Sequence, residues 1–246
     1  MKKYHSLFVS LIIIGASCLY SPNIQAQQKQ PTNTSFGITG SIGASTHLKN
    51  FRFVSGDINL EFTPNFTSNF NVGFVLRRKL TDRLRLQTEP SLSRFGASYN
   101  EGFELRGFNF QTESQTELLY IQLPLMLQVT TVPPRQTVYG RHRSETTYHF
   151  SAGVFGGYLL DAQFSGENTG APVGIEFAGA FSNNIQDQYT DLDAGIILGV
   201  GFENGYSNKF GIEGRVHFSV IDSGNADTFT FKPQNLALSG TIYLLF

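Results

Sequence analysis

The sequence predicts an all-β fold: an eight-stranded antiparallel transmembrane β-barrel with a filled polar interior. Three observations predict it: a secretory signal at the N-terminus, alternation of apolar and polar residues along eight segments, and the length of those segments, most of which have ten residues or more. Strict alternation means that the two faces of a strand contact different media. Ordinary strands have about 5–6 residues, whereas membrane-spanning strands need about 9–11. The segment lengths therefore favour a bilayer as the outer medium.

The N-terminus has the three parts of a secretory signal. Lys2 and Lys3 precede the apolar run Leu7–Gly15, and a polar stretch ends at Ala26. The apolar run is too short for a membrane-spanning helix, which needs about 20 residues. We therefore expect a signal peptide over 1–26 that directs Sec-type export, a short periplasmic segment over 27–34 and a barrel domain over 35–246.

Cys18 offers an alternative, in which the chain is a lipoprotein anchored through that residue. The residues before it, Gly15-Ala16-Ser17, lack the usual Leu three positions before the Cys. If Cys18 leaves with the signal, the mature chain has no cysteine, which excludes disulfides and thiolate metal sites. The sequence predicts no metal site and no cofactor.

The composition suits a barrel and argues against nucleic acid as a partner. Without Lys2 and Lys3, 16 basic residues face 19 acidic ones, a net charge of −3, whereas a phosphate-binding face needs a basic excess. The chain has 25 Gly, 23 Phe and ten Tyr. Glycine with abundant Phe and Tyr is typical of barrels with aromatic rows at the membrane interfaces.

The eight alternating segments are taken in chain order. They lie near 35–46, 70–80, 83–97, 114–131, 147–161, 192–204, 209–221 and 235–246. In the seventh, Phe210, Ile212 and Val216 share one parity, while Glu213 and Arg215 share the other.

Alternation alone does not say which face lies inside, so a soluble lipid-binding barrel with an apolar core is an alternative. The connections favour the membrane. Short ones are predicted at Thr81-Asp82 and 204–208, and long loops at 47–69, 98–113, 162–191 and 222–234. Short turns at one end and long loops at the other are the layout of outer-membrane barrels. The connection 132–146 is longer than this pattern predicts.

The polar parity carries the candidate site, a network inside the barrel. An eight-stranded barrel is just wide enough for side chains to fill it, and buried charges must pair. We therefore predict Arg–Glu pairs that bridge the wall, with Gln122 and Tyr243 completing hydrogen bonds. Two interpretations stay open, a plug and a narrow gated ion path. The predicted members are Arg77, Arg85, Glu89, Gln122, Glu203, Glu213, Arg215, His217 and Tyr243.

Four segments carry a family resemblance: Asn71–Ser98, Tyr120–Leu125 (YIQLPL), Ala152–Leu160 and Leu198–Glu203. Together they resemble the PorT-like outer-membrane β-barrel family of Bacteroidetes-type bacteria, and YIQLPL is the most specific part. The resemblance implies an integral outer-membrane protein of eight strands with both termini in the periplasm. It assigns no single activity, although the namesake type serves protein secretion.

Partners follow from this assignment: outer-membrane lipid and lipopolysaccharide, and an envelope or secretion protein. The terminal Phe246, on the apolar parity of the last segment, resembles the signal that the barrel-assembly machinery reads during biogenesis. The predicted function is therefore a non-enzymatic outer-membrane protein with a structural or accessory role in the envelope.

Three further patterns offer weaker alternatives. His217-Phe218-Ser219 resembles the His-x-Ser of outer-membrane lipid A deacylases, in which His activates a Ser nucleophile, but the same pattern recurs at 149–151. The acidic stretch 161–191 has no calcium-loop spacing, and its segment 172–181 is partly alternating and suggests a hairpin. The basic connection 132–146 could contact phospholipid headgroups or a periplasmic partner, or be a solvated turn.

Overall fold

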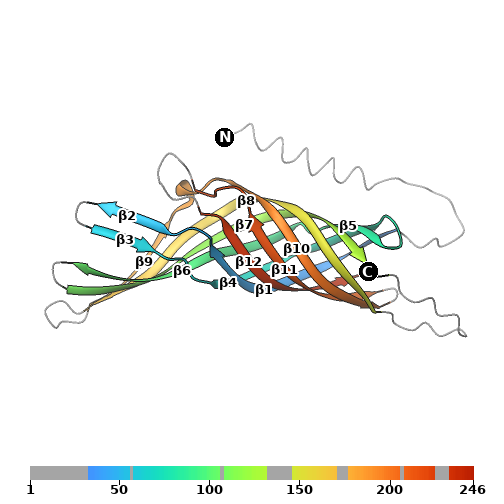
Figure 1. Ribbon diagram of the computed structural model, residues 1–246, viewed down its shortest axis with the longest axis horizontal. Coiled ribbons are helices and arrows are strands. Elements are labelled where there is room, and N and C mark those ends of the chain that lie inside the picture. The colour runs from blue at the N-terminus through green and yellow to red at the C-terminus, as the bar shows by residue number, and fades with distance from the viewer. Residues whose placement is uncertain are drawn as a thin grey trace, which may run out of the picture. The chain divides into compact units, whose positions relative to one another are not determined.

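A closed ring of antiparallel strands forms the fold (Figure 1). The computed structural model describes residues 33–55, 58–105, 108–131, 146–170, 177–205, 208–224 and 233–246. The predicted signal peptide and the connection 132–145 lie outside these residues. The elements are β1 (Thr34–His47), β2 (Phe51–Ser55), β3 (Ile58–Phe62), β4 (Thr67–Lys79), β5 (Leu84–Thr88), β6 (Ser91–Leu105), β7 (Phe108–Thr130), β8 (Thr146–Gly170), β9 (Phe177–Asn184), η2 (Gln186–Gln188), β10 (Leu192–Gly205), β11 (Lys209–Ser219) and β12 (Asn235–Leu245).

The ring closes where β1 pairs with β12. From β1 it passes through β4, then β5 and β6, and then β7, β8, β10, β11 and β12, with every pair antiparallel. Because β5 and β6 both lie between β4 and β7, they occupy one place, and the described part of the ring has eight places. The predicted antiparallel barrel is confirmed.

The third predicted strand, 83–97, is divided at Glu89-Pro90 into β5 and β6. Proline has no N–H to donate to a ladder, so it interrupts the strand. The Pro90 carbonyl still accepts a hydrogen bond from the Phe74 N–H of β4 at 3.1 Å, which keeps the two pieces in line.

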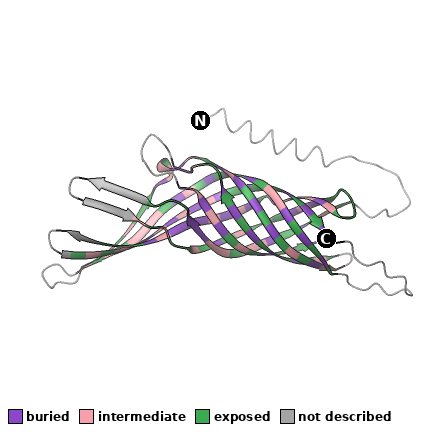
Figure 2. Ribbon diagram, viewed as in Figure 1, coloured by how far each residue is buried: buried purple, intermediate pink, exposed green. Residues whose placement is uncertain are grey.

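The apolar parity of the strands faces outward, as predicted, and the charged parity is enclosed (Figure 2). Ile42 and Phe74 are 76% and 68% exposed, whereas Glu213 and Arg215 are 1% and 6% exposed. A soluble barrel with an apolar core would show the reverse. Apolar side chains that cover the outside of a closed ring need hydrocarbon around them.

The apolar band has the height of a bilayer. Along β7 the outward side chains are apolar from Leu119 to Val129. Ten residue steps of about 3.3 Å, tilted by about 40°, rise roughly 25 Å, the height of the band in outer-membrane barrels. Beyond Leu119 the outward face of β7 becomes polar, with Asn109, Gln111, Glu113, Gln115 and Glu117.

The predicted long loops at 47–69, 98–113 and 162–191 are wrong in part, because strands continue through them. The pairing of β6 with β7 continues as far as Leu105↔Phe108. β8 continues to Gly170, and β9 pairs with residues 163–170 of β8. β2 and β3 form a separate hairpin within 47–69. Once the strands leave the bilayer, their outward residues are polar and their inward residues mix aromatic with polar and small side chains. Period two therefore loses much of its contrast, and the sequence resembles a loop. We call the four-stranded sheet formed by the outer parts of β6, β7 and β8 together with β9 the extension.

A β-bulge marks the start of the extension. Leu119 pairs with Asp161 but Tyr120 pairs with Leu159, which leaves Leu160 as the extra residue of β8. The bulge changes the parity of β8, so that Leu159 and Ala162 both face inward. In the described part of the chain no helix combines the length and hydropathy needed to cross a membrane.

We predict that Gly211→Val destabilises the barrel while Gly214→Val on the same strand does not. A Cβ at Gly211 would lie 2.1 Å from the Tyr243 ring inside the barrel, whereas one at Gly214 would have 4.0 Å to its nearest neighbour. Overpacking of this kind costs about 1–3 kcal/mol. Urea unfolding in detergent, followed by the gel shift between folded and unfolded bands, measures it. Equal midpoints for the two variants would contradict the inward placement of Gly211.

Candidate functional site

Glu203 of β10 is the first centre of the polar interior. It is buried, with 1% of its surface exposed, and its side chain forms ion pairs with three cations. Arg77 Nη1 and Arg85 Nη1 each lie 2.5 Å from its carboxylate oxygens, and Lys209 Nζ lies at 3.0 Å. The Tyr243 hydroxyl donates to the same carboxylate at 3.3 Å, and the Arg77 guanidinium lies 4.9 Å from the Tyr243 ring centroid. Glu203 and its three cations therefore form a group in which every charge has an opposite charge beside it.

Arg215 of β11 is the second centre. Its Nη1 and Nη2 donate to the two carboxylate oxygens of Glu89 at 2.5 and 2.7 Å, a bidentate pair. Its Nη2 also donates to Glu213 Oε2 at 2.8 Å. The Ser151 hydroxyl donates to Glu213, and His149 Nε2 lies 3.6 Å from Glu213 Oε2.

Gln87 joins the two centres. Its Oε1 accepts from Arg77 Nε at 2.6 Å, and its Nε2 donates to Glu89. The result is one continuous chain of contacts, which we call the lumenal network. Its members are Arg77, Arg85, Gln87, Glu89, His149, Ser151, Glu203, Lys209, Glu213, Arg215 and Tyr243.

Two of the charged pairs cross the full width of the barrel. In the eight-place ring β4 lies four places from β10, and the β5/β6 place lies four places from β11. Arg77–Glu203 joins β4 to β10, and Arg215–Glu89 joins β11 to the residue between β5 and β6. Both pairs thus connect diametrically opposite walls.

Two of the predicted members lie outside this network. Gln122 is buried, but its Nε2 has no hydrogen-bond partner among the described residues. His217 lies between two rings, with centroids 6.0 Å from Phe95 and 5.8 Å from Phe155.

Four network members were not among the predicted ones: Gln87, His149, Ser151 and Lys209. Inward parity was the signal available for Gln87, His149 and Ser151, because each alternates with outward apolar neighbours. Lys209 is the first residue of β11, and at the end of a strand the alternation of the sequence is a weak guide to which way a side chain points.

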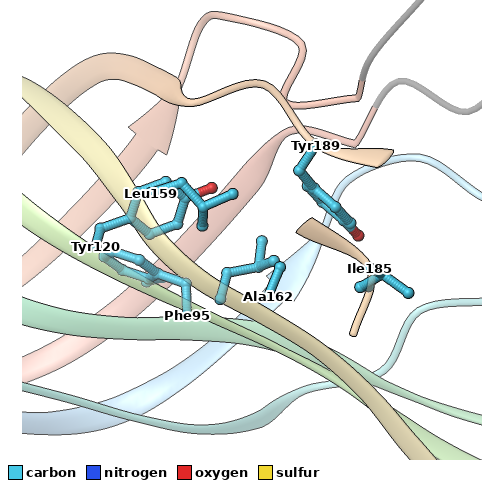
Figure 3. Packing of buried hydrophobic residues seen from close by; sticks show 8 residues of the cluster. Phe95, Tyr120, Leu159, Ala162, Ile185 and Tyr189 are labelled. Atoms are coloured by element: carbon cyan, nitrogen blue, oxygen red, sulfur yellow. The ribbon is translucent and has the colours of Figure 1, made fainter. Parts of the chain in front are cut away.

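A second buried cluster fills the barrel on the side of the extension (Figure 3). Phe95, Tyr120, Leu159 and Ala162 of the wall pack with residues that follow β9. These are Ile185 and Tyr189, which flank η2 and are 8% and 6% exposed. The segment is held in place where the Thr190 N–H donates to the Ser223 carbonyl at 2.8 Å. We call this group the aromatic cap; the sequence placed its last two members in an acidic loop.

The His-x-Ser pattern has no catalytic geometry here. The Ser219 hydroxyl donates to Asp193 Oδ2 at 2.8 Å, and Asn235 Nδ2 donates to the same oxygen at 3.2 Å. Ser219 and His217 are both buried in the barrel. Within the residues that the structure covers, no three His, Cys, Asp or Glu side chains are grouped as metal ligands.

Solved structures of two other proteins are similar to this chain. The Yersinia pestis attachment invasion locus protein Ail aligns over 87% of this chain and 99% of its own, with 12% identity and a TM-score of 0.33. Ail in complex with the heparin analogue sucrose octasulfate gives 11% identity, coverage of 85% and 99%, and a TM-score of 0.27. Neisserial surface protein A (NspA) gives 10% identity, coverage of 87% and 99%, and a TM-score of 0.28.

A comparison with curated protein sequences finds no match. The model of the outer membrane protein beta-barrel domain family, by contrast, matches residues 25–225. The match covers β1 to β11, which carry the lumenal network except for Tyr243 of β12. The chain therefore belongs to the outer membrane protein beta-barrel domain family and is an integral protein of the outer membrane.

Proposed function

We propose that this barrel is a closed, non-enzymatic anchor that holds its extension clear of the outer membrane. The observation that carries the proposal is the pairing of opposite walls through Arg77–Glu203 and Arg215–Glu89. A water-filled path would have to pass two charged bridges and then the aromatic cap.

The alternative of a narrow gated pore needs these bridges to open. Opening of the Arg215–Glu89 bridge would leave the Glu89 carboxylate without a cation in a narrow lumen, at a cost of several kcal/mol. Glu203 is held by three cations, so release of one would leave two in place. The network therefore favours a permanent plug.

The alternative of a lipid A-modifying enzyme has weaker support. A lipid ester would reach the outer surface of the barrel, whereas His217 and Ser219 face inward. The Ser219 hydroxyl also donates to Asp193, so His217 does not orient it as a nucleophile.

We further propose that the chain is a PorT-like member of its family, with an accessory role in protein secretion or in anchoring an envelope partner. The support is the YIQLPL segment in β7 and the three other matching segments. Crosslinking in cells, followed by identification of the captured proteins, tests this role. Capture of lipid-assembly factors alone, without secretion or envelope proteins, would argue against it.

The proposed orientation places both ends of the barrel in the periplasm. β1 begins beside the end of β4 and the turn at 80–83, and β12 ends beside the start of β11, as the pairs Thr34↔Arg78 and Lys209↔Leu245 show. The extension then lies at the cell surface, near lipopolysaccharide. The aromatic Phe246 is exposed, its N–H donates to the Phe36 carbonyl at 2.8 Å, and the two ring centroids are 5.9 Å apart.

We predict that the purified full-length mature protein conducts no ions. In planar lipid bilayers, with a general porin as positive control, we expect no discrete current steps, because charged bridges cross the lumen. Reproducible steps whose number increases with the amount of protein would overturn the closed-barrel proposal and favour the gated pore.

We predict that Arg215→Met lowers the free energy of unfolding by about 3–5 kcal/mol, because it leaves Glu89 and Glu213 buried without their cation. Arg94→Met is the matched control: its pair with Glu117 has side chains 29% and 37% exposed, and such pairs contribute about 0–1 kcal/mol. Urea unfolding in lipid vesicles measures both. Similar midpoint shifts for the two variants would argue against a stabilising network.

We predict that Phe246→Ala reduces the folded protein recovered from the outer membrane several-fold, because it removes the proposed assembly signal. Phe36→Ala is the control, since it removes the ring that packs on Phe246 but leaves the terminal aromatic in place. The heat-modifiable band in membrane fractions gives the readout. If both variants lose protein equally, Phe246 acts only through packing.

A further inference from the structure

The extension has an open edge at β9. β9 pairs with β8 from Gln163↔Asn184 to Gly170↔Phe177 and is the last strand in the sheet order (Figure 1). Among the described residues no strand pairs with its other side. Its sequence, FAGAFSNN, contains no charged residue and no proline, the devices that usually protect a sheet edge from pairing with another chain.

The register shows which backbone groups of β9 are available. The Ile185 N–H donates to the Ala162 carbonyl at 2.9 Å, which continues the β8–β9 pairing by one residue beyond the strand. In an antiparallel pair, hydrogen-bonded and non-hydrogen-bonded positions alternate. Residues 177, 179, 181 and 183 therefore bond to β8. The N–H and C=O groups of Ala178, Ala180 and Ser182 point away from the sheet.

A row of neighbouring residues crosses the extension to this edge, and we call it the acidic row because it contains two glutamates. The pairings place Asn100, Glu113, Glu167 and Ala180 side by side across the four strands. Glu113 and Glu167 are exposed neighbours, and neither has an ion pair within the described residues. Like charges directly opposite one another destabilise a sheet. The described residues 108–131, 146–170 and 177–205 contain no Lys or Arg that could offset them.

Aromatic rings line the inner face of the same sheet, and Phe62 of β3 packs on one of them. Ring centroids are 6.0 Å apart for Phe62–Tyr99, 6.5 Å for Tyr99–Phe164 and 5.4 Å for Phe164–Phe181. The Phe181 ring lies over Gly166, where a Cβ would come within 2.8 Å of it. These contacts join β9 to the rest of the extension, so the edge is presented as a formed strand.

We propose that the β9 edge binds an extended, basic polypeptide segment by strand addition, with a Lys or Arg of that segment beside Ala180. An added strand would lie about 4.8 Å from β9 and about 10 Å from Glu167. A long basic side chain can cross the small Ala180 and reach that carboxylate. The backbone groups of β9 supply affinity, and the acidic row selects a basic partner.

A second copy of this chain is a poorer occupant, because pairing two β9 edges would add a second acidic row to the first. The inference deepens the proposed anchor by naming the class of partner that it would hold. It depends on the extension standing clear of the bilayer and is independent of whether the lumen conducts.

We predict that the purified full-length protein in detergent binds a fluorescent nine-residue peptide of alternating Lys and Val, and that Ala180→Pro weakens this binding at least tenfold. Proline removes an N–H that points away from β8, so the β8–β9 pairing is kept. Ala180→Thr, which keeps the N–H and the strand, is the matched comparison, and we expect Ala180→Pro to bind at least tenfold more weakly than Ala180→Thr. Fluorescence anisotropy gives the dissociation constants.

Charge is tested separately. Glu113→Gln with Glu167→Gln should weaken binding about fivefold or more and flatten its salt dependence, and a Glu-Val peptide should bind at least tenfold more weakly than the Lys-Val peptide.

The proposal is overturned if the unmodified protein binds no Lys-Val peptide, if Ala180→Pro binds as well as Ala180→Thr, or if both peptides bind equally. Dimerisation that Ala180→Pro abolishes, without peptide binding, would assign the edge to a second copy instead. A conducting lumen with intact peptide binding would refute the closed barrel alone.

Discussion

The pairing of charges across a narrow lumen is the constraint on which this barrel depends. Hydrocarbon outside requires apolar side chains on one parity of every strand, which leaves the other parity to fill the interior. Within the lumenal network the chain places four cations and three carboxylates, most of them buried. Because an unpaired buried ion is costly, each of them meets an opposite charge, and the Arg77–Glu203 and Arg215–Glu89 bridges join opposite walls.

Small inward residues make these bridges possible. A Cβ at Gly199 would lie 2.1 Å from Glu213 Oε1 and 2.5 Å from the Ser151 hydroxyl, so a larger residue would displace the carboxylate that supports Arg215. Gly211 similarly makes room for the Tyr243 ring, which packs on Arg77. The glycine content that first suggests a barrel is thus partly a consequence of its filled interior.

The residues on both faces of the strands change in type where the strands leave the bilayer. Below the bulge between Leu119 and Tyr120, outward apolar residues and inward charges fit a membrane barrel. Above it, the same strands form a sheet whose outer face is acidic and whose inner face is aromatic. A closed ring has no edges, whereas this sheet ends at β9. The part of the chain most suited to contact other proteins is therefore the part released from barrel closure.

The sequence by itself determined the fold class, the places of the membrane strands and the inward parity of residues such as Glu213 and Arg215, because period two is a local property that a bilayer imposes on each strand. Only the tertiary structure decided which charges meet, since the Arg77–Glu203 pair depends on the register and order of strands far apart in the chain. It also decided that Ile185 and Tyr189 close one side of the interior and that β6 to β9 continue as a sheet. In those outer segments the inward face mixes aromatic with polar and small residues, so the alternation was too weak to predict the strands.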